Sequence, residues 1–209
     1  MTNFESLNQS VVSGDEAQVI EQVKAFMDAG VSPLEIINQG LIGGMNIVGP
    51  RFKAGDMFVP EVLMAARAMA AGVNIVKPFI ADNDLPSKGK ILLGTVKGDL
   101  HDIGKNLVGM MLESSGFKVI DLGIDIPADR FVAAIKEHKP DILAMSALLT
   151  TTMQNMKDTV DLVKEAGVSV KCIVGGAPVS QEFADQIGAA GYAPDAASAV
   201  DLCNKLLSA

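Results

Sequence analysis

Residues 97 to 105, with the sequence KGDLHDIGK, combine groups that can bind a metal ion. His101 is one of two histidines in the chain, and Asp99 lies two residues before it. A carboxylate beside an imidazole can accept the N–H of one ring nitrogen and leave the other nitrogen free to ligate a metal. Gly98 and Gly104 remove side chains where a bulky group could approach the backbone. The pattern favours a histidine-ligated metal, although an Asp-x-His pair before a helix is also typical of a capped, hydrogen-bonded turn.

Small and hydroxyl residues follow two further apolar runs. One run ends in Ser146 and continues through Leu148 to Thr150 and Thr152, and the other ends in Gly175-Gly176. Such residues could line a deep slot and donate hydrogen bonds into it, but Ser and Thr can equally cap the next helix. The chain has neither GxGxxG nor GxxxxGK[ST], so a dinucleotide site is disfavoured.

The elements that must position these residues alternate between strand and helix. Strands are expected at Lys90–Val96, Lys118–Leu122, Asp141–Met145, Val168–Val174 and Gly191–Ala193. Helices are expected at Ile103–Ser115, Ala128–His138, Thr152–Ala166, Gln181–Ala189 and Asp195–Ser208. This alternation predicts an α/β domain with a doubly wound, Rossmann-like parallel five-stranded sheet. Ligands of such sheets bind at the carboxyl ends of the strands, where the unusual residues lie.

The first half of the chain has helical periodicity instead. Ser13 and Glu16 form a capping-box pattern before one helix, and Pro33 opens the next at a favoured first position. With a short helix near the N-terminus and another from Pro60, this predicts an all-α four-helix bundle. We expect a helical cap at residues 1–84, an α/β domain at 90–209, and a polar linker at 81–89.

Composition excludes several function classes. The net charge is −8 and no Lys/Arg run is present, which argues against nucleic-acid binding. The apolar region from Val62 to Ile80 is interrupted by polar residues, so we expect no membrane span, and the N-terminus lacks a secretory signal. The two cysteines, Cys172 and Cys203, are expected to be buried thiols of a cytoplasmic protein.

The ordered segments Asp99-x-His101-x-x-Gly104, Ser146-x-Leu148 and Gly175-Gly176 resemble a known signature. It is the cobalamin-binding signature shared by methionine synthase and the small corrinoid proteins of methyltransferase systems. The N-terminal half is similar to the four-helix cap of the methyl-transferring branch. The resemblance therefore covers nearly the whole chain and implies a corrinoid cofactor, such as cobalamin, with cobalt at its centre.

The resemblance also implies roles for individual residues. His101 would be the lower axial ligand of the cobalt, and Asp99 and Thr152 would form a relay behind it, where methionine synthase has Ser in place of Thr152. Phe52 and Val59 would shield the methyl face, although both could instead be ordinary bundle core. The remaining cofactor contacts would come from the His101 loop and the ends of the later strands: Gly98, Leu100, Asp102, Ile103, Gly104, Ser146, Leu148, Thr150, Gly175, Gly176, Tyr192 and Ala196.

The function implied by the resemblance is that of a methyl carrier without catalytic activity of its own. Cobalt(I) would take a methyl group from a methylated amine, betaine, methanol or methoxy compound, giving methylcobalamin as the charged state. The partners would be a substrate:corrinoid methyltransferase, a corrinoid:tetrahydrofolate or corrinoid:thiol methyltransferase, and a reductive activase. The cap would move about the linker to expose the methyl group. The alternatives are a cobalamin-dependent mutase subunit, a corrinoid-sensing regulator, and a flavodoxin-like domain with a fortuitous loop.

Overall fold

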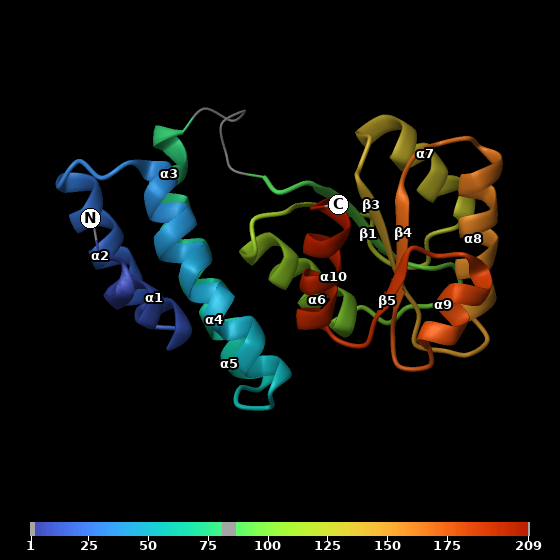
Figure 1. The fold of residues 1–209 in the computed structure, drawn as a ribbon, viewed down its shortest axis with the longest axis horizontal. Coiled ribbons are helices and arrows are strands. Elements are labelled where there is room, and N and C mark those ends of the chain that lie inside the picture. The colour runs from blue at the N-terminus through green and yellow to red at the C-terminus, as the bar shows by residue number, and fades with distance from the viewer. Residues whose placement is uncertain (1–2, 81–86, 209) are drawn as a thin grey trace. The chain divides into compact units, whose positions relative to one another are not determined.

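The fold comes from a computed structural model that describes residues 3–80 and 87–208. The chain divides into two compact units, a helical unit and a sheet unit, and the main break falls between Ser87 and Lys88 (Figure 1). Most of the predicted linker, residues 81–86, lies outside the described residues. A helical N-terminal part followed by a parallel sheet is the predicted fold class, which is therefore confirmed.

The helical unit is a bundle with buried apolar side chains from each of its longer helices. Its fully buried side chains include Leu7 of the first helix, Val19 of the second and Val62 of the last long helix. The elements in chain order are α1 (Glu5–Val12), α2 (Glu16–Asp28), α3 (Pro33–Glu35), the π-helix η1 (Ile36–Leu41), α4 (Ile42–Lys53), α5 (Val59–Val76) and the 3₁₀-helix η2 (Lys77–Phe79).

Two local features of the bundle differ from the prediction. Asp15, and not Ser13, caps α2 by accepting a hydrogen bond from the Gln18 N–H at 3.0 Å. The helix that starts at Pro33 passes through the π-helix η1 before it continues as α4. There the Asn8 side-chain amide donates to the carbonyl oxygens of Gln39 and Gly40, at 2.8 and 2.5 Å. A side chain from α1 thus satisfies carbonyl groups in the π-helical turn.

Helix α5 together with η2 forms an apolar segment from Val59 to Phe79. By length and composition alone, this segment could cross a membrane, so the prediction that it is too interrupted to do so is not supported by that test. In the structure α5 packs within the bundle and buries Val62, Ala65 and Met69. A core helix of a bundle passes the same test.

The sheet unit contains five parallel strands in the order β2-β1-β3-β4-β5. They are β1 (Lys90–Thr95), β2 (Lys118–Asp121), β3 (Ile142–Ser146), β4 (Lys171–Gly175) and β5 (Gly191–Ala193). Strand β4 begins three residues later than predicted. Its first residue, Lys171, pairs with Ile142, which is the first residue of β3, so residues 168–170 have no β3 strand partner.

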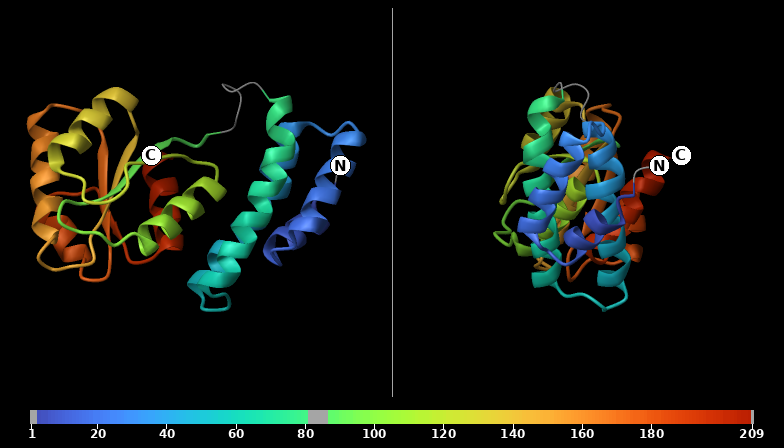
Figure 2. Two further views of the ribbon diagram at one scale, coloured as in Figure 1. Left: turned by 180° about the vertical axis from the view of Figure 1, so that it is seen from behind. Right: turned by 90° about the vertical axis from the view of Figure 1, so that its left-hand side faces the viewer.

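Helices cover both faces of the sheet (Figure 2). They are α6 (Ile103–Ser114), α7 (Ala128–His138), α8 (Met153–Glu165), α9 (Gln181–Ile187) and α10 (Ala196–Leu207). Alternate strand residues face opposite sides: Leu92 packs in the core with α7, α8 and α9, whereas Ile91 and Leu93 pack in the core with α6 and α10. Burial on both faces explains why the strands are almost continuously apolar.

The two cysteines occupy the cores on opposite faces of the sheet. Cys172 and Cys203 are both free and buried, as predicted. Burial disfavours the thiolate and raises the pKa of Cys172 to about 11 and that of Cys203 to about 12. Both side chains therefore act as small apolar core residues.

The strand register brings the unusual segments of the sequence to one edge. Thr95 of β1 pairs with Ser146 of β3, which pairs with Gly175 of β4, which pairs with Ala193 of β5. The chain continues from β1 to β2 on one side and from β3 to β5 on the other, so the strand order reverses between β1 and β3. Such a reversal is the usual ligand site of an open α/β sheet.

Candidate metal-ligand site

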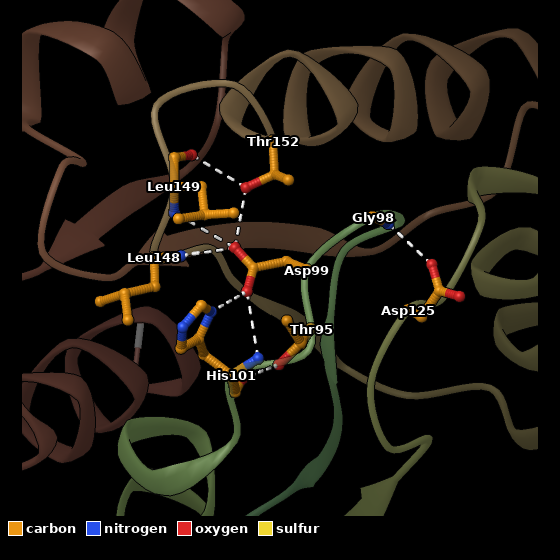
Figure 3. Close-up of polar contacts among 8 residues, drawn as sticks. All are labelled: Thr95, Gly98, Asp99, His101, Asp125, Leu148, Leu149 and Thr152. Atoms are coloured by element: carbon orange, nitrogen blue, oxygen red, sulfur yellow. Dashed lines mark hydrogen bonds and ion pairs between the residues drawn. The ribbon is translucent and has the colours of Figure 1, made fainter.

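The loop after β1 holds His101 against Asp99 (Figure 3). His101 Nδ1 lies 2.7 Å from Asp99 Oδ1, and the backbone N–H of His101 donates to the same oxygen at 3.1 Å. The Asp99 side chain is completely buried, whereas the His101 side chain is 51% exposed. An ionised Asp99 only accepts hydrogen bonds, so Nδ1 carries the proton and the lone pair of Nε2 is free, pointing away from the carboxylate (Figure 3).

The loop after β3 holds the other carboxylate oxygen of Asp99. The Leu148 and Leu149 N–H groups donate to Asp99 Oδ2 at 2.7 and 3.2 Å, and Thr152 Oγ1 lies 2.8 Å from it. Burial by itself disfavours the charged form of Asp99. The hydrogen bonds from Leu148, His101 and Thr152 outweigh this effect and hold the pKa of Asp99 well below its ordinary value. The site therefore contains a fixed, buried negative charge behind an accessible imidazole.

Thr152 contacts two acceptors with one hydroxyl hydrogen. Its Oγ1 lies 2.8 Å from Asp99 Oδ2 and 2.8 Å from the Leu149 carbonyl oxygen. Donation to the ionised carboxylate is the stronger of the two bonds. The Thr152 methyl group, which a serine would lack, lies 3.6 Å from the position of a Cβ built on Gly98. The extra methyl is thus in ordinary packing distance of the His101 loop.

We expect Thr152→Val to lower the free energy of unfolding by about 1–2 kcal/mol, because it removes a hydrogen bond to a buried charge and keeps the shape of the side chain. Thr152→Ser, which keeps the hydroxyl, should cost less than the valine variant. Urea denaturation of the three proteins measures the difference. A valine variant as stable as the native protein would show that the hydroxyl contributes nothing to the network.

Three residues that the sequence did not single out fix the same loop from other directions. Thr95 Oγ1 donates to the His101 carbonyl oxygen at 2.9 Å, and Asn155 Nδ2 donates to the Lys97 carbonyl oxygen at 2.9 Å. Asp125 Oδ1 accepts from the Gly98 N–H at 2.7 Å. The positions of two of them in the sequence could have indicated this role. Thr95 ends β1 and Asp125 follows β2 at the same sheet edge.

The four glycines predicted at the site have different reasons to be glycine. A Cβ on Gly176 would meet the Ala147 carbonyl oxygen at 1.9 Å, and one on Gly175 would meet the Ala193 carbonyl oxygen at 2.8 Å. Close packing of the strand ends therefore requires both, with or without a ligand. Gly98 has a φ of +78°, in the left-handed region. A Cβ on Gly104 would find no atom within 4 Å, so this residue does face open space.

The remaining predicted contacts differ in exposure. Ile103 is 82% exposed, Leu100 67% and Leu148 43%, so the His101 loop, the start of α6 and the loop after β3 each carry an exposed large apolar side chain. Thr150 and Asp102 are exposed, and the Asp102 carboxylate accepts a hydrogen bond from the Asn106 side chain at 3.0 Å. Ser146 and Tyr192 are half-buried and lie in β3 and β5, whereas Ala196 is buried at the start of α10.

Phe52 and Val59 belong to the helical unit. Phe52 lies near the end of α4 and is half-buried, and Val59 is the first residue of α5 and is 38% exposed. They flank the α4–α5 loop. Neither is part of the fully buried bundle core.

Taken together, the geometry provides one metal-ligating nitrogen. Asp99 occupies Nδ1 of His101, which leaves Nε2 for a single coordination bond. Exposed apolar side chains next to His101 in the sequence and in the loop after β3 favour a large, largely apolar group over a hydrated ion. The arrangement is suited to hold a metal that is already part of an organic cofactor.

Comparison with known proteins identifies relatives over the full length. Residues 89–201 match a family model described as a B12 binding domain, and residues 4–77 match a second model with the same description. A corrinoid protein of Desulfitobacterium hafniense is 46% identical over 99% of this chain and 98% of its own length. Dimethylamine corrinoid protein 2 of Methanosarcina acetivorans is 45% identical over 98% of this chain and 95% of its own.

Solved structures show the same relationship. The crystal structure of the methanol:cobalamin methyltransferase complex from Methanosarcina barkeri contains a chain with a TM-score of 0.89 and 33% identity, covering 98% of this chain and 79% of that one. A cobalamin-binding protein from Desulfitobacterium hafniense has a TM-score of 0.84 and 35% identity, covering 99% of both chains.

Proposed function

The chain belongs to the family of B12-binding corrinoid proteins, and on that premise we propose that it carries methyl groups on a bound corrinoid. The observation that supports this best is the free Nε2 of His101, backed by the buried carboxylate of Asp99 at the reversal of strand order. Relatives named as dimethylamine and trimethylamine corrinoid proteins match more than nine-tenths of this chain. A carrier, and not an enzyme in its own right, is the function that these relatives support.

His101 would hold the cobalt of the corrinoid through Nε2. The corrinoid, when bound, supplies the cobalt to which the methyl group is attached. Asp99 keeps the proton on Nδ1, and Thr152 with the Leu148 N–H keeps Asp99 in place. The His101 side chain is half-exposed, so Nε2 would be accessible to the bound cofactor while Nδ1 stays paired with Asp99.

The exposed apolar residues around His101 would contact the corrin ring. Leu100, Ile103 and Leu148 are positioned for this by the loops after β1 and β3, and Gly98, Asp102 and Gly104 complete that surface. The nucleotide tail would lie along the ends of β3, β4 and β5. The residues proposed to line its path are Ser146, Thr150, Gly175, Gly176, Tyr192 and Ala196.

The helical unit would protect the methyl group. We propose, from the family resemblance, that Phe52 and Val59 shield it and that motion about the linker exposes it to partners. One partner is a methyltransferase that charges the protein, in line with the methyltransferase complex among the similar structures. A second methyltransferase that passes the methyl group to tetrahydrofolate or a thiol, a reductive activase, and a cytoplasmic location are further parts of the proposal. Mutase and sensor functions are not favoured by the relatives.

We expect His101→Ala to weaken binding of hydroxocobalamin by about 10-fold or more, because the cobalt loses its protein ligand. Titration of the apoprotein, followed by the visible spectrum of the cofactor, measures both affinity and ligation. His138→Ala is the matched control, since His138 is the other histidine and ends α7. Unchanged affinity and spectrum in the His101 variant would refute the assignment.

A further inference from the structure

The loop between β2 and α7, residues 122–127, contacts the His101 loop. It lies on the side opposite Leu148, Leu149 and Thr152, which bond to the Asp99 carboxylate. Figure 3 shows Asp125 on one side of the loop and Leu148, Leu149 and Thr152 on the other. The Asp125 carboxylate accepts from the Gly98 N–H at 2.7 Å, and the Asp125 N–H donates to the Asp99 carbonyl oxygen at 3.1 Å. Asp125 therefore forms hydrogen bonds with two successive residues of the His101 loop, Gly98 and Asp99.

Asp125 adopts an unusual backbone conformation to make these bonds. Its φ is +55°, and among the described residues only Lys139 is another non-glycine with positive φ. Lys139 is the C-cap of α7, where a left-handed residue is common. Asp125 caps no helix. Left-handed aspartate is less costly than most residues there but still unfavourable, so the hydrogen bonds to residues 98 and 99 offset a local strain.

The neighbouring contacts make this loop a continuation of the sheet. The Ile126 N–H donates to the Thr95 carbonyl oxygen, and the Thr95 N–H donates to the Gly123 carbonyl oxygen, each at 3.0 Å. Val96 and Ile126 form an isolated parallel bridge. The loop that bonds to Gly98 is thus itself held to β1 by backbone hydrogen bonds. Its position does not depend on the side chain of Asp125 alone.

We propose that Asp125 is a positioning residue for His101, an inference that rests on the proposed ligation of cobalt by that histidine. The carboxylate of Asp99 is anchored by the loop after β3, and its backbone is anchored by Asp125. Both ends must be fixed for Oδ1 to hold the imidazole in one orientation. An imidazole held in one orientation before the cofactor binds would pay a smaller ordering cost on binding it.

Two full-length variants separate the hydrogen bond from the backbone strain. Asp125→Asn keeps a side-chain oxygen acceptor and a residue that tolerates positive φ. Asp125→Gly permits the same φ but removes the acceptor. In the apoprotein, we expect faster hydrogen–deuterium exchange of the Gly98 amide in the glycine variant and near-native exchange in the asparagine variant. Thermal unfolding verifies that both are folded.

The loaded protein provides the second measurement. With hydroxocobalamin, the glycine variant should bind about 10-fold more weakly, as is usual when support behind a metal ligand is lost. After reduction to cobalt(II) in protein whose histidines are labelled with ¹⁵N, its electron paramagnetic resonance (EPR) spectrum should show a smaller fraction with the two-line splitting of a ¹⁵N ligand, and asparagine should restore both properties. The inference would be overturned if Asp125→Gly kept the native amide exchange, cofactor affinity and EPR splitting. It would also be overturned if Asp125→Asn were as impaired as Asp125→Gly. If His101→Ala loses the histidine nitrogen splitting while Asp125→Gly behaves like the native protein, the proposed function stands. Only the role of Asp125 is then refuted.

Discussion

Gly176→Ala is expected to destabilise the sheet unit by about 3 kcal/mol or more, since two independent costs add. The new Cβ would lie 1.9 Å from the backbone oxygen of Ala147, which cannot move without disturbing the end of β3. The φ of Gly176, +124°, is also one that side-chain-bearing residues rarely adopt. Urea denaturation followed by circular dichroism of the apoprotein measures the loss.

Gly104→Ala is the matched control for this prediction. A Cβ there meets nothing within 4 Å, and alanine at a helical position favours α6 by up to about 1 kcal/mol. The apoprotein should therefore be as stable as the native one or more so. Weaker hydroxocobalamin binding by this variant would indicate that the open space beside Gly104 belongs to the cofactor. A Gly176 variant with native stability would contradict the packing explanation for the glycine pair.

Asp99→Asn is expected to abolish ligation by His101. The amide has the size of the carboxylate, but its NH₂ group cannot accept from the backbone N–H of His101, so that hydrogen bond is lost as well. The donors from Leu148, Leu149 and Thr152 surround Oδ2, so the amide oxygen should take that position. The NH₂ group then faces His101 Nδ1 and can only donate to it. His101 must then carry its proton on Nε2, and the nitrogen that should bind the metal has no free lone pair.

Nitrogen NMR of the apoprotein reports which ring nitrogen carries the proton. We expect the Nδ1–H form in the native protein and the Nε2–H form in Asp99→Asn, together with about 10- to 100-fold weaker hydroxocobalamin binding. Asp185→Asn is the control, because the Asp185 carboxylate is exposed in α9, outside the proposed cofactor contacts, and accepts from the Gln181 side chain at 2.7 Å. Native affinity in the Asp99 variant, with its tautomer changed, would mean that Nε2 is not the ligand.

Much of the sheet unit could be predicted from the sequence because burial on both faces makes each strand an apolar run. The errors lie at the ends, as at Lys171, where the length of the neighbouring strand decides the boundary. In the bundle, the capping pattern at Ser13 was misleading because Asp15, two residues later, offers the carboxylate that caps α2. The π-helix leaves no comparable pattern in the residue types.

The site was predictable where side chains define it. Thr152 lies 53 residues after Asp99 in the sequence, yet parallel strands that end in one row bring it to the Asp99–His101 pair. The amides of Leu148 and Leu149 were missed because every residue has an N–H group, so residue type carries no signal. Asp125 was missed because a lone acid after a strand is typical of a turn. The glycine pair was noticed, but contact between strand ends, rather than a ligand, is enough to require it.

Labelling the histidines with ¹⁵N and recording the cobalt(II) EPR spectrum of the reconstituted protein tests His101 ligation most directly. A ¹⁴N ligand splits each line into three and a ¹⁵N ligand into two. We predict a triplet in unlabelled protein and a doublet in labelled protein, retained in His138→Ala and lost in His101→Ala. A triplet that persists in the labelled protein would show that the cofactor's own base, and not His101, ligates the cobalt.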